Sequence, residues 1–259
     1  MVDGQSNDLP EGQPAPNPAG EVPLPSGRIT RGVVRVGDTV RRPSKASSPF
    51  VARLLGRFEG LNVSWAPRYL GEDALGRDVL TFLPGAVPLK WRTFTDEQVC
   101  EAGRLLRQFH DATRGSELAG ACSVVCHNDP GPNNLVFQQE RPYAFIDFDM
   151  AAPGEPFEDL GYMAWAWCIS SKADRQPAEH QAHQVRVLAE AYEVDVDRME
   201  LIPAILERLT RNISFWSEKL TSPDTTLLSV ERIAENVAWS KRELAYAMAH
   251  QKLFRNALL

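Results

Sequence analysis

The sequence predicts an α+β fold of two lobes, a small β-rich N-terminal lobe and a larger, mainly helical C-terminal lobe. Two observations predict this division. Up to residue 86, short β-rich runs alternate with turn residues, and from Thr95 onward apolar residues recur mostly at helical spacing. Because ligands often bind between two such lobes, a cleft there is the expected place for a site.

The composition excludes several classes of protein. With 43% hydrophobic residues, the 259-residue chain can bury a sizeable core, and its formal charge of −6 argues against binding nucleic acid through phosphates. No apolar run reaches the roughly 18 residues that span a membrane, and no secretory leader is visible. The four cysteines form no CxxC pair, which fits a reducing cytoplasm. We therefore expect a cytoplasmic protein without nucleic-acid or membrane partners.

The N-terminal part divides into a tail and a β lobe. Residues 1–26 carry six prolines, four acids and no base, so they are predicted to form a mostly disordered tail. Residues 27–86 form the predicted N-lobe. Here Gly37 and Asp38 suit a tight hairpin turn, "PFVARLLGRFEG" has apolar residues at helical spacing, and "RDVLTFLPG" is typical of a strand that ends at Pro-Gly.

Residues 87–259 form the predicted helical C-lobe. Thr95 and Gln98 have the spacing of a capping box that starts a helix. One face of that helix is apolar and comprises Val99, Ala102, Leu106, Phe109 and Thr113. Further helical patterns cover residues 156–168, 178–194, 198–220 and 228–258. Trp165, Trp167, Trp216 and Trp239 lie in these patterns and are expected in the core, with an acceptor pocket as the alternative for one or two of them.

A polar, turn-rich loop, "CHNDPGPNNL", interrupts this helical region. The strand-like "LVF" follows it, and after "QQERP" comes a second strand-like run, "YAFI", so the two runs predict a hairpin. Antiparallel pairing would place Asn134, just before the first strand, beside Asp147, just after the second. An amide oxygen next to a carboxylate suits Mg²⁺, and the Pro-Gly-Pro turns can fold Asp129 over the same place. A zinc site at Cys122, Cys126 and His127 is disfavoured because no second ligand pair follows.

The same residues carry a resemblance to a known family. His127, Asp129 and Asn134 fit the spacing H-x-D-x-x-x-x-N, and "IDFD" follows at the distance of the metal-binding aspartate of protein kinases. Arginine is absent from the middle of the motif, and neither D-F-G nor A-P-E is present. The chain more closely resembles the aminoglycoside phosphotransferase and choline kinase-like family, from about Ile29 to Trp167. The resemblance implies a protein-kinase-like bilobal fold.

The resemblance also implies roles for individual residues. Asp129 corresponds to the catalytic aspartate that orients the acceptor hydroxyl, and His127 to a catalytic-loop residue that braces the loop. Asn134 and Asp147 correspond to the Mg²⁺ ligands that bridge the ATP phosphates. Asp159, in "EDLGY", corresponds to a buried acid that ties the loop to the next helix. Asp149 is left open between a second metal contact and a loop brace.

The nucleotide site of the family maps onto the N-lobe. Thr81 and Leu83 correspond to the hinge positions whose backbone meets the adenine edge. Arg42 stands at the position of the phosphate-binding lysine, with Lys45 three residues on, and arginine can hold phosphate by two hydrogen bonds. The glutamate that pairs with this lysine in the family is not evident before Glu59, which departs from the family pattern.

The resulting hypothesis is an ATP- and Mg²⁺-dependent small-molecule kinase that phosphorylates a hydroxyl of an antibiotic or metabolite. Two alternatives stay open, a catalytically weak kinase-like nucleotide-binding module and a glycosyltransferase that uses "DFD" as its D-x-D motif. The acceptor is open as well. From Ser171 onward the chain has thirteen acidic and twelve basic residues, so this region is not acidic enough to favour a polycationic acceptor. His110, His180, His183 and His250 have no partners evident in the sequence and are expected at the surface or in packing.

Overall fold

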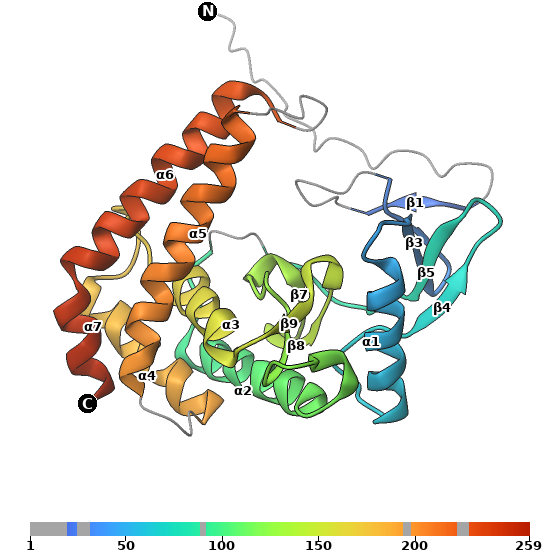
Figure 1. The fold of residues 1–259 in the computed structure, drawn as a ribbon, viewed down its shortest axis with the longest axis horizontal. Coiled ribbons are helices and arrows are strands. Elements are labelled where there is room, and N and C mark those ends of the chain that lie inside the picture. Colours follow the sequence, from blue (N-terminus) through green and yellow to red (C-terminus); the bar gives the residue numbers. More distant parts are fainter. Residues whose placement is uncertain (1–19, 25–31, 89–91, 194–197, 222–227) are drawn as a thin grey trace, which may run out of the picture. The chain divides into compact units, whose positions relative to one another are not determined.

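A computed structural model gives the structure of residues 20–24, 32–88, 92–193, 198–221 and 228–259 (Figure 1). The chain divides into two compact units. The first comprises Met1–Ser44 and Leu70–Phe82, and the second comprises Lys45–Tyr69 and Leu83–Leu259. The predicted separation of a β-rich part from a larger helical part is therefore present, although the residues are divided differently between the two.

A five-stranded sheet makes up the described part of the first unit (Figure 1). In the order β1-β2-β3-β5-β4, the strands are Val22–Pro23, Val34–Val36, Thr39–Pro43, Arg77–Thr81 and Tyr69–Glu72. β2 and β3 pair in antiparallel fashion around Gly37, whose φ of 57° suits a tight turn. The hairpin expected at Gly37 and Asp38 is confirmed.

The N-terminal tail begins to pair earlier than predicted. Of residues 1–26, the structure describes only 20–24, and the rest lie outside the described residues. β1 pairs with Val34 and Arg35 of β2, and Glu21 forms an ion pair of 2.8 Å with Arg77. These five residues are therefore an ordered part of the segment that was predicted to be mostly disordered. Their apolar content is low, but an edge strand needs only backbone hydrogen bonds and one ion pair to dock.

Helix α1 (Ser48–Gly60) belongs to the second unit, although the sequence assigned it to the N-lobe. Its buried face packs on residues of that unit. The ring of Phe58 lies 4.9 Å from Trp65, 5.6 Å from Phe109 and 6.0 Å from Phe148, measured between centroids. Apolar spacing predicted which face of the helix is buried. The apolar spacing did not show which lobe packs against that face, because periodicity identifies a buried face but not its partner.

The described residues of the second unit form six further α-helices, with two short antiparallel strand pairs among them. The helices are α2 (Asp96–Thr113), α3 (Pro156–Met163), α4 (Ala178–Tyr192), α5 (Leu201–Thr221), α6 (Val230–Ala249) and α7 (Gln251–Leu258). The capping box that starts α2 is confirmed, since Thr95 accepts from the backbone of Gln98 and Gln98 accepts from that of Thr95. The predicted apolar face of α2 is buried throughout.

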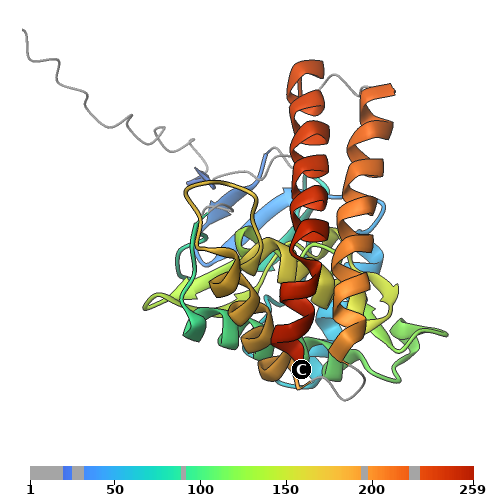
Figure 2. The same cartoon turned by 90° about the vertical axis from the view of Figure 1, so that its left-hand side faces the viewer.

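The C-terminal helices form a layer of their own. α5 and α6 run side by side (Figure 2). The helical pattern at residues 228–258 is interrupted at His250, which separates α6 from α7. A π-helical turn, Ala164–Cys168, follows α3 and contains Trp165 and Trp167, which are both buried. Trp216 in α5 is buried as well. No described helix is long and apolar enough to cross a membrane.

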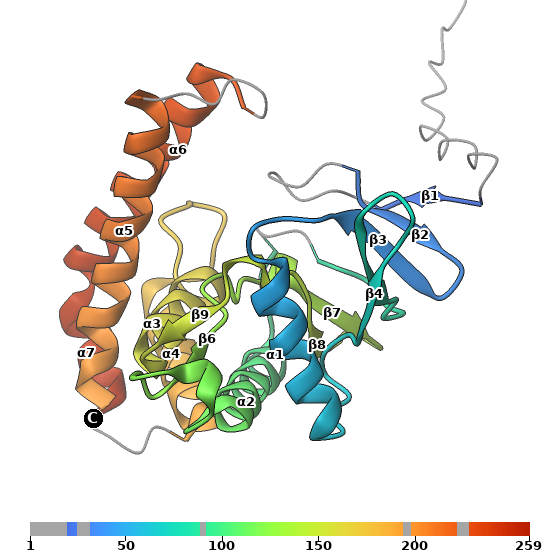
Figure 3. The same cartoon turned by 45° about the vertical axis from the view of Figure 1, so that its right-hand side comes forward.

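Two strand pairs position the predicted site. β6 (Val124–Cys126) pairs with β9 (Ala152–Gly154) next to α3 (Figure 3), and β7 (Leu135–Gln138) pairs with β8 (Arg141–Phe145). The hairpin was predicted with a five-residue connection, but both strands extend further and leave a two-residue turn. Gln139 and Glu140 both have positive φ, as such a turn requires. The sequence did not predict this extension, because Gln138 and Arg141 are polar and lie outside the apolar runs from which the strands were predicted.

Candidate active site

The loop of residues 127–134 connects β6 to β7 within the second unit. It leaves β6 through Asn128, whose left-handed φ of 63° turns the chain, and it enters β7 through a 3-10 turn at Pro132–Asn134. Asparagine is one of the few residues that adopts this left-handed conformation at low cost. The turn residues seen in the sequence therefore build the loop as expected.

Asp159, near the start of α3, ties the loop down. Its carboxylate accepts hydrogen bonds from the backbone N–H groups of His127, at 2.6 Å, and Asn128, at 2.7 Å. The side chain is completely buried, so these two donors replace the water that the carboxylate loses. The contacts confirm the brace that the resemblance implied for Asp159.

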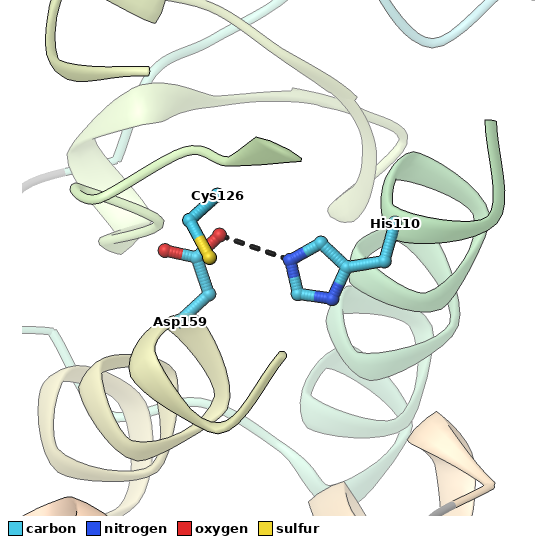
Figure 4. A group of neighbouring side chains, drawn as sticks. All are labelled: His110, Cys126 and Asp159. Atoms are coloured by element: carbon cyan, nitrogen blue, oxygen red, sulfur yellow. Dashed lines mark hydrogen bonds and ion pairs between the residues drawn. The ribbon is translucent and has the colours of Figure 1, made fainter. Parts of the chain in front are cut away.

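His110 is the third partner of Asp159, and the sequence did not reveal it. From α2, its Nε2 lies 3.1 Å from Asp159 Oδ2 (Figure 4). Its Nδ1 lies 2.7 Å from the hydroxyl of Tyr192 on α4. His110 is completely buried, as expected for a packing residue, and its two partners were not evident in the sequence. Burial by itself raises the pKa of the Asp159 carboxyl, but the hydrogen bonds from His110 and from the His127 backbone hold that pKa below its usual value.

Cys126 completes a buried group with His110 and Asp159, whose ligand atoms all lie within 4.8 Å of one another (Figure 4). This group does not have the chemistry of a metal centre. Burial raises the pKa of the Cys126 thiol, and the thiol donates to the carbonyl oxygen of Glu155 at 3.3 Å, so the sulfur keeps its proton. Both oxygens of the Asp159 carboxylate are already engaged by hydrogen-bond donors. The group is a structural brace.

Asp129 lies at the centre of the loop and is held from two sides. Its Oδ1 accepts a hydrogen bond from the hydroxyl of Tyr162 on α3, and its Oδ2 accepts one of 2.7 Å from the side-chain amide of Asn134. Burial, and then the charge of Asp129, raises the pKa of Tyr162 well above its usual value, so the tyrosine stays a neutral donor. Tyr162 was not singled out in the sequence, although it follows Asp159 by three residues and so shares its helix face.

The hairpin pairs the backbone of Asn134 with that of Ile146, the residue just before Asp147. The peptide of Ile146, just before Asp147, is held at both ends: its N–H donates to the Asn134 carbonyl at 2.9 Å, and its carbonyl lies 3.1 Å from His127 Nε2. Asp147 itself has a left-handed φ of 62°, a sparsely populated conformation for a residue other than glycine. Such conformations persist where the surrounding structure fixes them, and they are frequent at functional sites.

The oxygen donors of this hairpin end fit Mg²⁺. The side chains of Asn134 and Asp147 supply an amide oxygen and a carboxylate, which are hard ligands. The Asn134 amide nitrogen donates to Asp129, so its oxygen, which accepts from Asn133 at 3.0 Å, is the atom that would face an ion. The ring of His127 is buried among Phe145 and Phe148, at centroid distances of 5.3 and 5.0 Å, and its Nε2 is engaged by Ile146. His127 therefore has the contacts of a brace.

Asp149, two residues after Asp147, forms an ion pair with Lys45 at the start of the second unit. The sequence had left Asp149 open between a metal contact and a brace, and it gave Lys45 only a secondary place. The ion pair brings a cation close to the turn at Asp147. The signal was not readable from the sequence, because the two residues are 104 positions apart.

The remaining predicted residues are divided between the two units. In the first, Arg42 is buried and its Nε donates to Oδ2 of Asp78 at 3.2 Å across β3 and β5, and Thr81 ends β5 opposite Thr39. Leu83 starts the second stretch of the second unit and is half-buried. That Thr81 and Leu83 meet the adenine, and that Arg42 meets the phosphates, remain predictions.

Comparison with known proteins agrees with the resemblance. The model of the phosphotransferase enzyme family matches residues 116–202, which contain the loop, the hairpin and Asp159. Among curated proteins, the trifolitoxin immunity protein of Rhizobium leguminosarum bv. trifolii is 30% identical over 259 residues, covering 90% of this chain and 96% of that protein.

Solved structures show the same fold at low sequence identity. A spectinomycin phosphotransferase in complex with ADP and spectinomycin has a TM-score of 0.59 and 13% identity, covering 85% of this chain and 88% of its own. A choline kinase from Cryptosporidium parvum Iowa II has a TM-score of 0.57 and 12% identity, covering 88% and 87%. The α+β, protein-kinase-like fold expected from the sequence is confirmed.

Proposed function

Because the chain belongs to the phosphotransferase enzyme family, we propose that it transfers the γ-phosphoryl group of ATP, with Mg²⁺, to a hydroxyl group of a small molecule. The observation that carries this proposal is the arrangement of Asp129, Asn134 and the Asp147 turn on one hydrogen-bonded hairpin end. A nucleotide-binding module without chemistry would not need an acid at Asp129 held by two donors.

The residues of the chain have separable tasks in this reaction. Bound Mg²⁺ supplies positive charge against the phosphate oxygens, and the side chains of Asn134 and Asp147 would hold it. Asp129 orients the acceptor hydroxyl and takes its proton as the hydroxyl oxygen bonds to the γ-phosphorus and the bond to the ADP oxygen breaks. Tyr162 and Asn134 keep the Asp129 carboxylate in one orientation, which aligns the nucleophile before the transfer.

A glycosyltransferase is the weaker hypothesis. The "DFD" motif follows an antiparallel hairpin, and Asp149 of this motif is paired with Lys45. The loop contacts of Asp129 would also have no purpose in that reaction. A thermal-shift comparison of Mg-ATP with a Mg-UDP-sugar discriminates the two: the proposal expects stabilisation by Mg-ATP alone.

The acceptor is found by measuring ADP release with Mg-ATP over a panel of hydroxyl compounds. Aminoglycosides, choline and trifolitoxin belong in this panel, because the relatives are named for these or related molecules. Binding of Mg-ATP without ADP release for any acceptor, and without slow hydrolysis, would support the non-catalytic binding module instead.

The contacts of Lys45 and Arg42 predict which cation serves the phosphates. Asp78 is completely buried, so Arg42 has a structural task as its partner, and Arg42→Ala would leave an uncompensated buried charge. Lys45, by contrast, is ion-paired next to the metal-binding turn and is about one-third exposed. We expect Lys45→Met to raise the apparent KM for Mg-ATP about tenfold or more. The change in Tm should be smaller than for Arg42→Ala, because the Lys45–Asp149 pair is less buried than the Arg42–Asp78 pair.

Arg42→Lys is the matched variant, because it keeps the charge opposite Asp78. Steady-state ADP-release kinetics with a working acceptor measure both KM values. If Arg42→Lys raises the KM and Lys45→Met leaves it unchanged, Arg42 serves the phosphates as the family resemblance implied.

A further inference from the structure

A pocket in the second unit is lined by arginines and has no acidic residue. Its walls come from the π-helical turn after α3, the following loop and α4, with Arg92 and Thr93 opposite. Among its lining residues are Arg92, Arg175, Trp165, Trp167, Gln181 and Gln184. Two cations and several amide groups without a carboxylate make a lining that favours a negatively charged ligand.

Arg175 is the cation of this pocket that has no carboxylate partner among the residues the structure describes. Arg92 forms an ion pair of 2.7 Å with Glu140. Arg175 makes only a 3.2 Å hydrogen bond from Nη1 to the Thr93 hydroxyl, and its buried Nε has no hydrogen-bond partner within the described chain. A buried donor without an acceptor costs free energy, and a bound carboxylate would supply the missing acceptor.

The loop that carries Arg175 is fixed in place. From α4, the buried Gln181 accepts a hydrogen bond of 3.0 Å from the Ser170 backbone and donates to the carbonyls of Ser170, at 3.1 Å, and Gln176, at 2.7 Å. These bonds hold both ends of the segment that contains Arg175. The backbone that carries Arg175 is therefore fixed, which lowers the entropy cost of ordering this loop around a ligand.

Trp167 connects this pocket to the catalytic loop. Its indole lines the pocket, and its Nε1 donates at 3.1 Å to the carbonyl of Pro130, the residue after Asp129. On the α5 side of the loop, the Arg208 guanidinium lies 3.9 Å from the ring centroid of Tyr162, which holds Asp129. The loop of the proposed catalytic acid is thus in contact with the pocket through Trp167 and, through Tyr162, with the cation of Arg208.

We infer that the acceptor of the proposed phosphoryl transfer is a hydroxy acid, whose carboxylate is bound by Arg175 while its hydroxyl faces Asp129. This inference rests on the proposed function and specifies its substrate class. A cationic acceptor would be repelled by Arg175, and no acidic residue of the pocket lining would offset this repulsion. Planar arginine suits a carboxylate because both oxygens can accept in parallel.

The test is a titration of three probes that share one benzylic hydroxyl and differ in charge: mandelate, neutral 1-phenyl-1,2-ethanediol and cationic 2-amino-1-phenylethanol. Binding is followed without nucleotide, through the indole N–H signal of Trp167 in a nitrogen-15 correlation spectrum, which Trp167→Phe assigns. We expect mandelate to shift this signal with a dissociation constant at least tenfold lower than that of the diol. The amine should not shift the signal.

Arg175→Gln should weaken mandelate binding about tenfold or more, and Arg175→Lys should restore part of it. Arg232→Gln is the control, since Arg232 is an exposed arginine on α6 that pairs with Glu235, and it should change nothing. Equal binding of the three probes, no binding of any, or an unchanged affinity in Arg175→Gln overturns the inference. Mg-ATP titrated into the same samples keeps the tests apart: if it binds and mandelate does not, only the hydroxy-acid inference fails.

Discussion

Replacing Asp129 by asparagine is expected to slow phosphoryl transfer on the order of a hundred-fold or more, while Mg-ATP binds almost as it does to the native chain. The reason is the position of this carboxylate. It is held by Tyr162 and Asn134 and is proposed to act on the acceptor hydroxyl, which matters only once the acceptor is placed. Asparagine has the same shape and can still bond to the Tyr162 hydroxyl, which can turn to accept.

Single-turnover rates with a working acceptor, together with calorimetric titration of Mg-ATP, measure the two effects separately. Asp174→Asn provides the matched control, because Asp174 is exposed and the change in charge is identical. Loss of nucleotide binding in Asp129→Asn would contradict the assignment, since it would place this residue at the metal instead of the acceptor.

The second large effect is expected on stability. Asp159→Asn should lower the free energy of unfolding by about 3–5 kcal/mol, because removing one member of a buried ionic group leaves its partners unsatisfied. The amide can accept from only one of the two backbone donors of His127 and Asn128 and presents N–H groups to the other. Urea denaturation measures the change. Asp111→Asn on α2 is the control, since its exposed ion pair with Arg107 should contribute less than about 1 kcal/mol.

The pH dependence of this effect has a definite sign. The pKa of Asp159 is lower in the folded chain than in the unfolded one, so its contribution is fully present above the unfolded value, near pH 4. The contribution is lost as the pH falls through the folded pKa. The stability difference between the native chain and Asp159→Asn should therefore shrink below about pH 4. A difference that stays constant down to pH 3, or a stable Asp159→Asn variant, would show that the brace contributes little.

Local signals in the sequence predicted much of this structure. The capping box at Thr95, the turn at Gly37 and the loop from His127 to Asn134 all depend on residues within a few positions of one another. The spacing of Asn134 and Asp147 could be read as well, because a hairpin converts a short separation in sequence into a neighbourhood in space.

Contacts over long separations could not be predicted in this way. His110 meets Asp159 across 49 positions, and Lys45 meets Asp149 across 104. Neither pair leaves a periodic pattern, since each depends on how helices and loops pack. The membership of α1 in the second unit depends on packing in the same way. Tyr162 is different, because helical spacing from Asp159 could have placed it near the loop.

The central claim is that the hairpin end of Asn134 and Asp147 holds Mg²⁺ against the phosphates of ATP. Calorimetric titration of ATP with and without Mg²⁺, into the native chain and into Asp147→Asn, tests it most directly, with exposed Asp38→Asn as the control. We predict that Mg²⁺ strengthens ATP binding to the native chain and to Asp38→Asn, and that Asp147→Asn loses this dependence together with its turnover. Binding of Mg-ATP to Asp147→Asn with the native affinity and the native dependence on Mg²⁺ would contradict the claim.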